Sequence, residues 1–176
     1  MTNLSTIHIS RRQLLLGTGA TALLSSAFML YRQLGEYPEE TIDLYSLSNK
    51  ESAIYRYIGK WLLPPGGGMP GHGGDDITIA RIDRILLQVP PGKRWMLNAL
   101  PVVFEHGTAF SHFGAKRLTN LSTETGYPYL EGWANSDMVV KSQLWSALKA
   151  MYGFSYFERD DVLEAMQTSS HCPVFS

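Results

Sequence analysis

The stretch VKSQLWSALKAM, residues 140–151, decides the fold class. Its apolar residues Val140, Leu144, Ala147, Leu148 and Met151 recur at steps of four and three, which is the spacing of one face of an α-helix. A half-buried β-strand would instead alternate apolar and polar residues. The stretch therefore predicts an amphipathic helix that packs its apolar face against other helices.

The same period recurs upstream at Ile54, Tyr57, Ile58, Trp61 and Leu62. Ser48 precedes this segment and Glu51 follows three residues later, which is the pattern of a capping box. Pro64-Pro65 ends the helix, because proline has no backbone N–H and blocks the preceding turn. A helix from about residue 49 to residue 63 is predicted.

Further helices are predicted at residues 77–87, 93–107, 118–133 and 159–166. Pro101 lies inside the second of these segments, so that helix is either kinked or divided into two pieces. Gly153 is expected to interrupt the helix that contains residues 140–151. Because no stretch alternates convincingly, the chain is predicted to be all-α, a compact bundle of about six short helices after an N-terminal signal or anchor segment.

An arginine pair precedes an apolar run near the N-terminus. Ser10, Arg11 and Arg12 come before the run, which begins with Leu14 and Leu15 and continues to Leu30. This is the pattern of a twin-arginine export signal, which the twin-arginine translocase reads on proteins that have already folded. The chain is therefore expected in the periplasm or on the periplasmic face of the inner membrane.

The fate of the leader stays open. Ser25-Ser26-Ala27 offers small residues to a signal peptidase, whereas the 17 residues of 14–30 are at the low end of what spans a hydrocarbon core. Residues 14–30 are therefore either removed or kept as a membrane anchor, with Arg11 and Arg12 holding the N-terminus inside.

The predicted organisation is a leader at 1–30, a linker at 31–45 and a single helical domain at 46–176. The 146 residues after the leader are enough for one core. They hold 13 basic and 16 acidic residues, a net charge of −3, with no basic patch. Nucleic acid is therefore not an expected partner.

Cys172 is the only cysteine. A single thiol closes no intrachain disulfide and holds no iron–sulfur cluster, and the chain has no C-x-x-C-H haem attachment motif. The thiol is either buried, free or paired with another chain.

Residues 66–71 match the letters of a G-x-G-x-x-G nucleotide motif. The motif needs a strand before it and a helix start after it, whereas a helix and two prolines precede it here, so we reject a nucleotide site. His72 follows in the same loop, and His106 and His112 come later at a spacing that matches no zinc signature. A small exported metal-binding protein or enzyme using His72, His106 or His112 is the alternative hypothesis, and packed or surface histidines are the simpler interpretation.

A more specific pattern covers residues 118–166. It consists of Leu118-Thr119-x-Leu121-Ser122, Tyr129-Leu130-x-x-Trp133-x-x-Ser136, Leu144-Trp145-x-Ala147-Leu148-Lys149, Tyr156-Phe157 and Val162. In order and spacing it resembles the gluconate 2-dehydrogenase subunit 3-like family, the small subunits of membrane-associated flavin dehydrogenases. The helix before Pro64-Pro65-Gly66 is similar to that family's first helix, so the resemblance covers about residues 46–168. The tail departs from it, with Gln167-Thr168-Ser169 where a glycine-tyrosine element is common.

The resemblance implies a non-catalytic accessory subunit with no catalytic residue, metal or cofactor of its own. FAD would lie in a large partner of the glucose–methanol–choline oxidoreductase type, an alcohol or sugar dehydrogenase exported on this chain's leader. Electrons would pass to a cytochrome c subunit or another membrane acceptor. A stand-alone envelope protein with a structural role is a third hypothesis.

Aromatic residues in the family-like segments are the candidate partner contacts, because aromatic side chains are enriched at interfaces. The candidates are Tyr129, Trp133, Trp145, Tyr156 and Phe157. Core packing is the alternative role for each of them, and Trp133 in particular has the position of a core residue.

Overall fold

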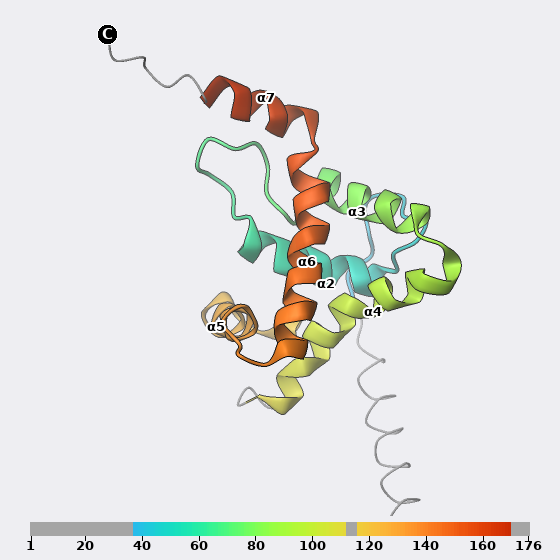
Figure 1. The fold of residues 1–176 in the computed structure, drawn as a ribbon, viewed down its shortest axis with the longest axis vertical. Coiled ribbons are helices and arrows are strands. Elements are labelled where there is room, and N and C mark those ends of the chain that lie inside the picture. The colour runs from blue at the N-terminus through green and yellow to red at the C-terminus, as the bar shows by residue number, and fades with distance from the viewer. Residues whose placement is uncertain (1–36, 112–115, 170–176) are drawn as a thin grey trace, which may run out of the picture. The chain divides into compact units, whose positions relative to one another are not determined.

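The computed structural model describes residues 37–111 and 116–169, which belong to one compact unit beginning at Tyr37. These residues form six α-helices and two 3-10 helices, with no strand among them (Figure 1). The helices are α2 (Asn49–Leu62), α3 (Asp76–Gln88), α4 (Pro91–Gly107), η1 (Thr108–Phe110), η2 (Leu118–Asn120), α5 (Thr123–Ala134), α6 (Val139–Phe157) and α7 (Asp160–Ser169). The predicted all-α class is confirmed.

The start of α2 follows the predicted capping box. The Ser48 side chain accepts a hydrogen bond from the backbone N–H of Glu51, and the Glu51 carboxylate accepts one from the backbone N–H of Ser48 at 2.7 Å. Both bonds satisfy donors that a helix start leaves without an intrahelical partner. The helix ends at Leu62, before Pro64-Pro65, as predicted.

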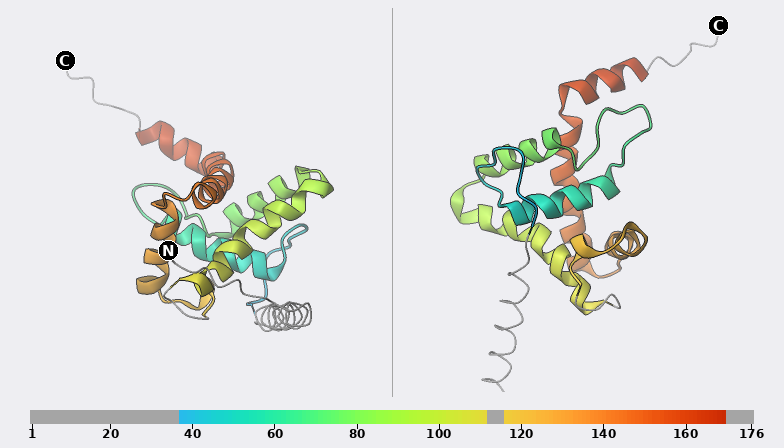
Figure 2. Two further views of the ribbon diagram at one scale, coloured as in Figure 1. Left: turned by 60° about the horizontal axis from the view of Figure 1, so that its bottom comes forward. Right: turned by 180° about the vertical axis from the view of Figure 1, so that it is seen from behind.

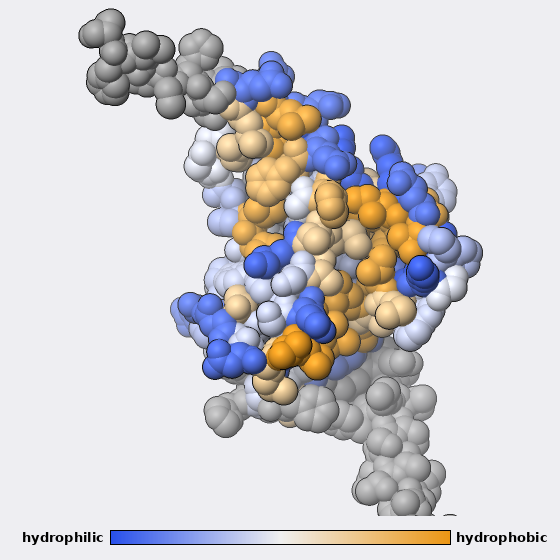
Figure 3. Space-filling model, viewed as in Figure 1, coloured by the Kyte–Doolittle hydropathy of each residue, from blue (hydrophilic) through white to orange (hydrophobic). Residues whose placement is uncertain are grey.

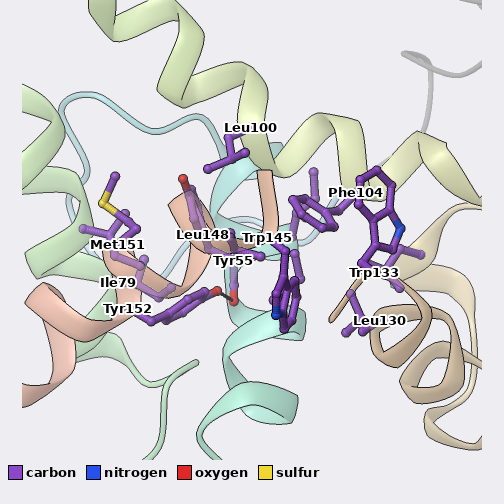
Figure 4. Close-up of a cluster of buried hydrophobic side chains, with 14 of the residues drawn as sticks. Tyr55, Ile79, Leu100, Phe104, Leu130, Trp133, Trp145, Leu148, Met151 and Tyr152 are labelled. Carbon is purple, nitrogen blue, oxygen red and sulfur yellow. Dashed lines mark hydrogen bonds between the residues drawn. The ribbon is translucent and has the colours of Figure 1, made fainter. Parts of the chain in front are cut away.

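Helix α6 is the centre of the arrangement. It packs against α3 and α5, while α2 packs against α4, and α7 continues from the end of α6 (Figures 1 and 2). The side chains between these helices form one hydrophobic cluster (Figure 4). Within it, the Phe104 ring lies 4.5 Å from that of Trp133 and 6.0 Å from that of Trp145. Rings from α4, α5 and α6 therefore meet at one place in the core.

The buried face of α6 differs from the predicted one. Trp145, Leu148, Met151 and Tyr152 are buried, whereas Val140 and Ala147 are exposed. The helix also continues through Gly153, where an interruption was expected. Because Tyr152, Ser155 and Tyr156 are buried on either side of the glycine, packing outweighs the roughly 1 kcal/mol that a helical glycine costs.

Helix α4 continues unbroken across Pro101. Proline cannot donate a hydrogen bond to the carbonyl four residues earlier, which is that of Leu97. The Tyr55 hydroxyl, 3.5 Å away, donates to this carbonyl instead. A tertiary contact from α2 therefore replaces the hydrogen bond that the proline removes.

The start of α5 is also later than predicted. Residues 118–120 form the 3-10 helix η2, and the α-helix begins at Thr123. The last helix begins at Asp160, close to the expected position, and extends beyond Met166 to Ser169.

Residues 37–45 are packed on the helices, so the predicted linker at 31–45 is wrong for this part. The buried carboxylate of Asp83 accepts hydrogen bonds from the backbone N–H groups of Tyr45, Ser46 and Leu47 at 2.7–3.0 Å. Glu40 pairs with Arg56 at 2.7 Å. These polar contacts join residues that lie 16 or more positions apart in the chain.

Candidate partner-binding surface

The predicted export signal lies outside the described residues. This holds for Ser10, Arg11, Arg12, Leu14 and Leu15, for residues 14–30 as a whole, and for Cys172. The twin-arginine address therefore stays a prediction. Among the helices that the structure describes, none has both the length and the hydropathy needed to cross a membrane.

Four of the five predicted partner contacts lie in the domain core. Tyr129, Trp133, Trp145 and Tyr156 are at most 7% exposed. The Tyr129 hydroxyl donates to the Phe104 carbonyl at 2.8 Å, and the Tyr156 hydroxyl donates to the Pro70 carbonyl at 3.0 Å. These side chains hold helices and loops of the same chain together, which is the core-packing alternative, and a partner contact at them stays a prediction.

Phe157 is the one candidate on the surface. It is 43% exposed, and Phe154, one turn earlier on α6, is 59% exposed. On α7, Leu163 and Met166 are 42% and 41% exposed. Figure 3 shows hydrophobic surface running from α7 onto the adjoining end of α6. We name Phe154, Phe157, Leu163 and Met166 the α6–α7 apolar surface.

The orientation of α6 explains why these side chains face solvent. Tyr152, Ser155 and Tyr156 point inward, and residues 154 and 157 lie on the other side of a helix with 3.6 residues per turn. On α7, Val162 is fully buried and its neighbour Leu163 is exposed. A helical wheel of α6 that places Tyr152 and Tyr156 in the core would have put Phe154 on the exposed side. Leu163 and Met166 give no signal beyond their hydropathy.

Two hollows lie beside α6 and α7. One, of about 220 Å³, is lined by Leu62, Leu63, Lys149, Tyr152, Gly153 and Phe157. The other, of about 550 Å³, lies between residues 68–70 of the glycine-rich loop and Asp161, Glu164 and Ala165 of α7. The first is large enough to receive an apolar side chain from another protein.

Arg159 fixes the junction between α6 and α7. Its guanidinium is almost fully buried and lies 2.6 Å from Asp75 and 2.7 Å from Asp161, and it also donates to the Thr78 hydroxyl at 3.0 Å. Asp75 is the N-cap of α3, so one side chain connects α3 to the start of α7. Nothing in the local sequence marks Arg159 for this role, because its partner Asp75 is 84 residues away.

The same pairing lowers the pKa of both aspartates. Burial by itself raises the pKa of Asp75, but hydrogen bonds from Arg159 and from the backbone of Thr78 and His72 outweigh that effect. For Asp161 the hydrogen bonds from Arg159 are the largest cause of the lowered pKa. Both carboxylates therefore stay charged through the neutral range and hold α7 in place.

The histidines of the alternative hypothesis are not brought together. The His72 ring accepts a hydrogen bond from the backbone N–H of Gly74 at 3.0 Å, within a loop whose glycines 66, 67, 68 and 71 adopt positive φ. His106 lies in the last turn of α4, and its Nε2 is 3.0 Å from Lys50 Nζ. His112 is outside the described residues. In residues 37–111 and 116–169, no group of three His, Cys, Asp or Glu side chains is placed to hold a metal ion.

A cleft of about 470 Å³ lies beside His106. Its lining includes Trp133 and Tyr129 from α5 and Lys141 from α6, and Lys141 Nζ lies 5.3 Å from the centre of the Trp133 ring. Next to His106 in the chain, the buried Glu105 carboxylate accepts hydrogen bonds from the Tyr37 hydroxyl at 2.9 Å and from Thr119. Burial is the main cause that raises the pKa of Tyr37 to about 12. These bonds attach residue 37 and η2 to α4.

Comparisons with protein-family models, with curated proteins and with solved structures found no match. The resemblance to the gluconate 2-dehydrogenase subunit 3-like family therefore stays a prediction from the sequence.

Proposed function

We propose that this chain is a non-catalytic accessory subunit of a periplasmic flavin-dependent alcohol or sugar dehydrogenase complex. It supplies the twin-arginine export signal and stabilises the FAD-bearing large subunit, which has no signal of its own. Electrons from the flavin pass to a cytochrome c subunit or another membrane acceptor and not through this chain.

The α6–α7 apolar surface carries this proposal. Phe154, Phe157, Leu163 and Met166 present apolar side chains from two helices that the Arg159 pairing holds together. Contiguous apolar surface on a folded domain commonly marks a protein-binding site. Large apolar side chains beside a hollow are typical of the anchor positions that dominate binding energy.

The acidic residues of α7 define the partner's surface further. Asp160 and Glu164 are exposed on the helix that carries Leu163 and Met166. A partner with an apolar patch rimmed by lysine or arginine matches this arrangement in charge. The large subunit is expected to present such a patch.

The experiment is co-purification of the tagged full chain from its native envelope extract, with bound flavin as the readout. We expect an FAD-containing protein in a fixed ratio to the chain. Phe157→Asp and Leu163→Asp should each weaken this association at least thirtyfold, because a charge in an apolar contact removes an anchor.

Val139→Asp and Val140→Asp are the matched controls. Both valines are exposed apolar residues of the same helix, at its opposite end. They should leave the flavin protein bound. Recovery of the wild-type chain without any flavin protein would contradict the proposal. If the control variants lost the flavin protein to the same extent, the contact would have to lie outside the α6–α7 apolar surface.

One observation favours the alternative, a small exported metal-binding protein or enzyme. His106 borders the 470 Å³ cleft together with Ser111 and Lys141, so a histidine has access to a site of ligand size. Metal analysis of the purified full chain tests this function. Stoichiometric metal that His106→Ala removes would favour the alternative, and metal-free protein would contradict the metal-binding form of it.

A further inference from the structure

We propose that the turn between α3 and α4 docks on an anionic lipid surface. We name residues 84–96, from the end of α3 through Pro90-Pro91 to the first turns of α4, the α3–α4 tip. The tip lies at the periphery of the helical domain in all three ribbon views (Figures 1 and 2). The inference does not depend on the dehydrogenase partner.

The tip exposes large apolar side chains. Trp95 is 65% exposed and Met96 is 58% exposed, and Leu87 on the other side of the turn is 38% exposed. Tryptophan is the residue most characteristic of the membrane–water interface, where its ring lies at the level of the headgroups. Packing within the domain does not account for Trp95, because its ring lies outside the core cluster.

The charge of this segment is of one sign. Residues 84–96 contain Arg84, Lys93 and Arg94 and no aspartate or glutamate. The chain as a whole carries one more acidic than basic residue, so this excess of three positive charges is local. Basic residues beside exposed apolar side chains are the combination that binds anionic lipid headgroups.

The backbone of the tip is suited to the poorly hydrated lipid interface, because few of its polar groups need a hydrogen bond to water. Pro90 and Pro91 have no N–H group, and the Pro90 carbonyl accepts hydrogen bonds from Lys93 and Arg94 at 2.9 and 3.1 Å. The N–H of Val89 donates to the Leu86 carbonyl at 3.2 Å. Few backbone groups would therefore lose a hydrogen bond to water on entering the interface.

Arg94 makes the tip rigid. Its Nη2 donates to the carbonyls of Leu87 and Val89 at 2.9 and 3.1 Å, which satisfies the end of α3 and joins it to α4. Arg84 and Lys93 are exposed and remain on the outside of the turn. The headgroup contacts are therefore assigned to Arg84 and Lys93, and insertion to Trp95 and Met96.

The test uses the full chain on vesicles of phosphatidylcholine alone or mixed equally with phosphatidylglycerol, with brominated phosphatidylcholine as a quencher of tryptophan emission. On the mixed vesicles we expect emission to be quenched more in the wild type than in Trp95→Phe. Arg84→Gln and Lys93→Gln should each weaken vesicle binding about fivefold, and added salt should reduce the effect of both. Since residues 1–36 are the same in every variant, the differences report on the tip.

Lys60→Gln and Met138→Ser are the matched controls, because both residues are exposed and lie away from the tip. They should bind vesicles as the wild type does. Equal quenching in the wild type and Trp95→Phe, or equal quenching on neutral and anionic vesicles, would overturn the inference. The inference would likewise be overturned if Trp95→Phe, Arg84→Gln or Lys93→Gln bound vesicles as the wild type does but lost an acidic protein partner. The tip would then be a protein-binding site.

Discussion

Arg159 Nη1 lies 2.6 Å from Oδ2 of Asp75, although 84 residues separate the two in the chain. Asp75 caps α3, and Arg159 occupies the junction at which α7 leaves α6. The pairing therefore determines where α7 stands, and with it the shape of the α6–α7 apolar surface. Partner binding at this surface, as proposed, would therefore depend on one buried guanidinium.

Arg159→Leu should lower the free energy of unfolding by about 3 kcal/mol, because removing one member of a buried ion pair leaves the other without its partner. Urea denaturation followed by circular dichroism measures the change. Arg84→Leu, at an exposed arginine of α3, is the control and should change stability by no more than about 0.5 kcal/mol. Equal effects of the two substitutions would contradict the assigned role of Arg159.

The lowered pKa values of Asp75 and Asp161 predict acid sensitivity. A carboxyl group with a lower pKa in the folded than in the unfolded chain stabilises the fold fully above its unfolded pKa of about 4. This stabilisation is lost as the pH falls through the folded pKa. When the denaturation midpoint is measured from neutral pH down to about pH 3, it should therefore begin to fall once the pH is below about 4. Arg159→Leu should make this fall shallower. An unchanged slope in the variant would show that other carboxylates cause it.

Trp145 and Phe157 should behave differently when each is changed to alanine. Trp145 is buried between Trp61 and Phe104, so its loss should cost about 3–5 kcal/mol of stability. Phe157→Ala should cost about 1 kcal/mol or less while weakening the association with the flavin protein. Thermal unfolding and co-purification on the same samples separate the two effects. A folded Trp145→Ala chain that only loses its partner would restore the original interface prediction.

Asp83→Ala should release the segment that precedes α2. It leaves the N–H groups of Tyr45, Ser46 and Leu47 without their shared acceptor, at a cost of about 3 kcal/mol. Limited proteolysis should then cut near residues 37–46, whereas the wild-type segment should resist. Equal protection of both chains would show that Tyr37 and Glu40 are sufficient to hold the segment.

Local patterns in the sequence were enough to predict the fold class and most helices. Ser48 and Glu51 fixed the start of α2 because a capping box needs only neighbouring residues. The inward face of α6 could not be derived in the same way, because hydropathy ranks Val140 above Trp145 and Tyr152. Rings on other helices, those of Phe104, Trp61 and Tyr55, decide which side is buried.

The misassigned elements depend on contacts between distant residues. Pro101 and Gly153 mark breaks in an isolated helix, and here the Tyr55 hydroxyl and the packing of Tyr152 and Tyr156 compensate for them. Of the aromatic residues that the sequence suggested as partner contacts, Phe157 is exposed and the other four are buried. Which aromatic residues remain exposed depends on where α7 stands, and that position depends on Arg159 and Asp75.

The central claim is that this chain carries a folded flavin dehydrogenase across the inner membrane. The most direct measurement is the distribution of FAD-dependent dehydrogenase between cytoplasm and periplasm in cells that carry Arg11→Lys and Arg12→Lys together. The account predicts that the dehydrogenase stays in the cytoplasm, still bound to the altered chain. Normal periplasmic dehydrogenase in these cells would contradict it.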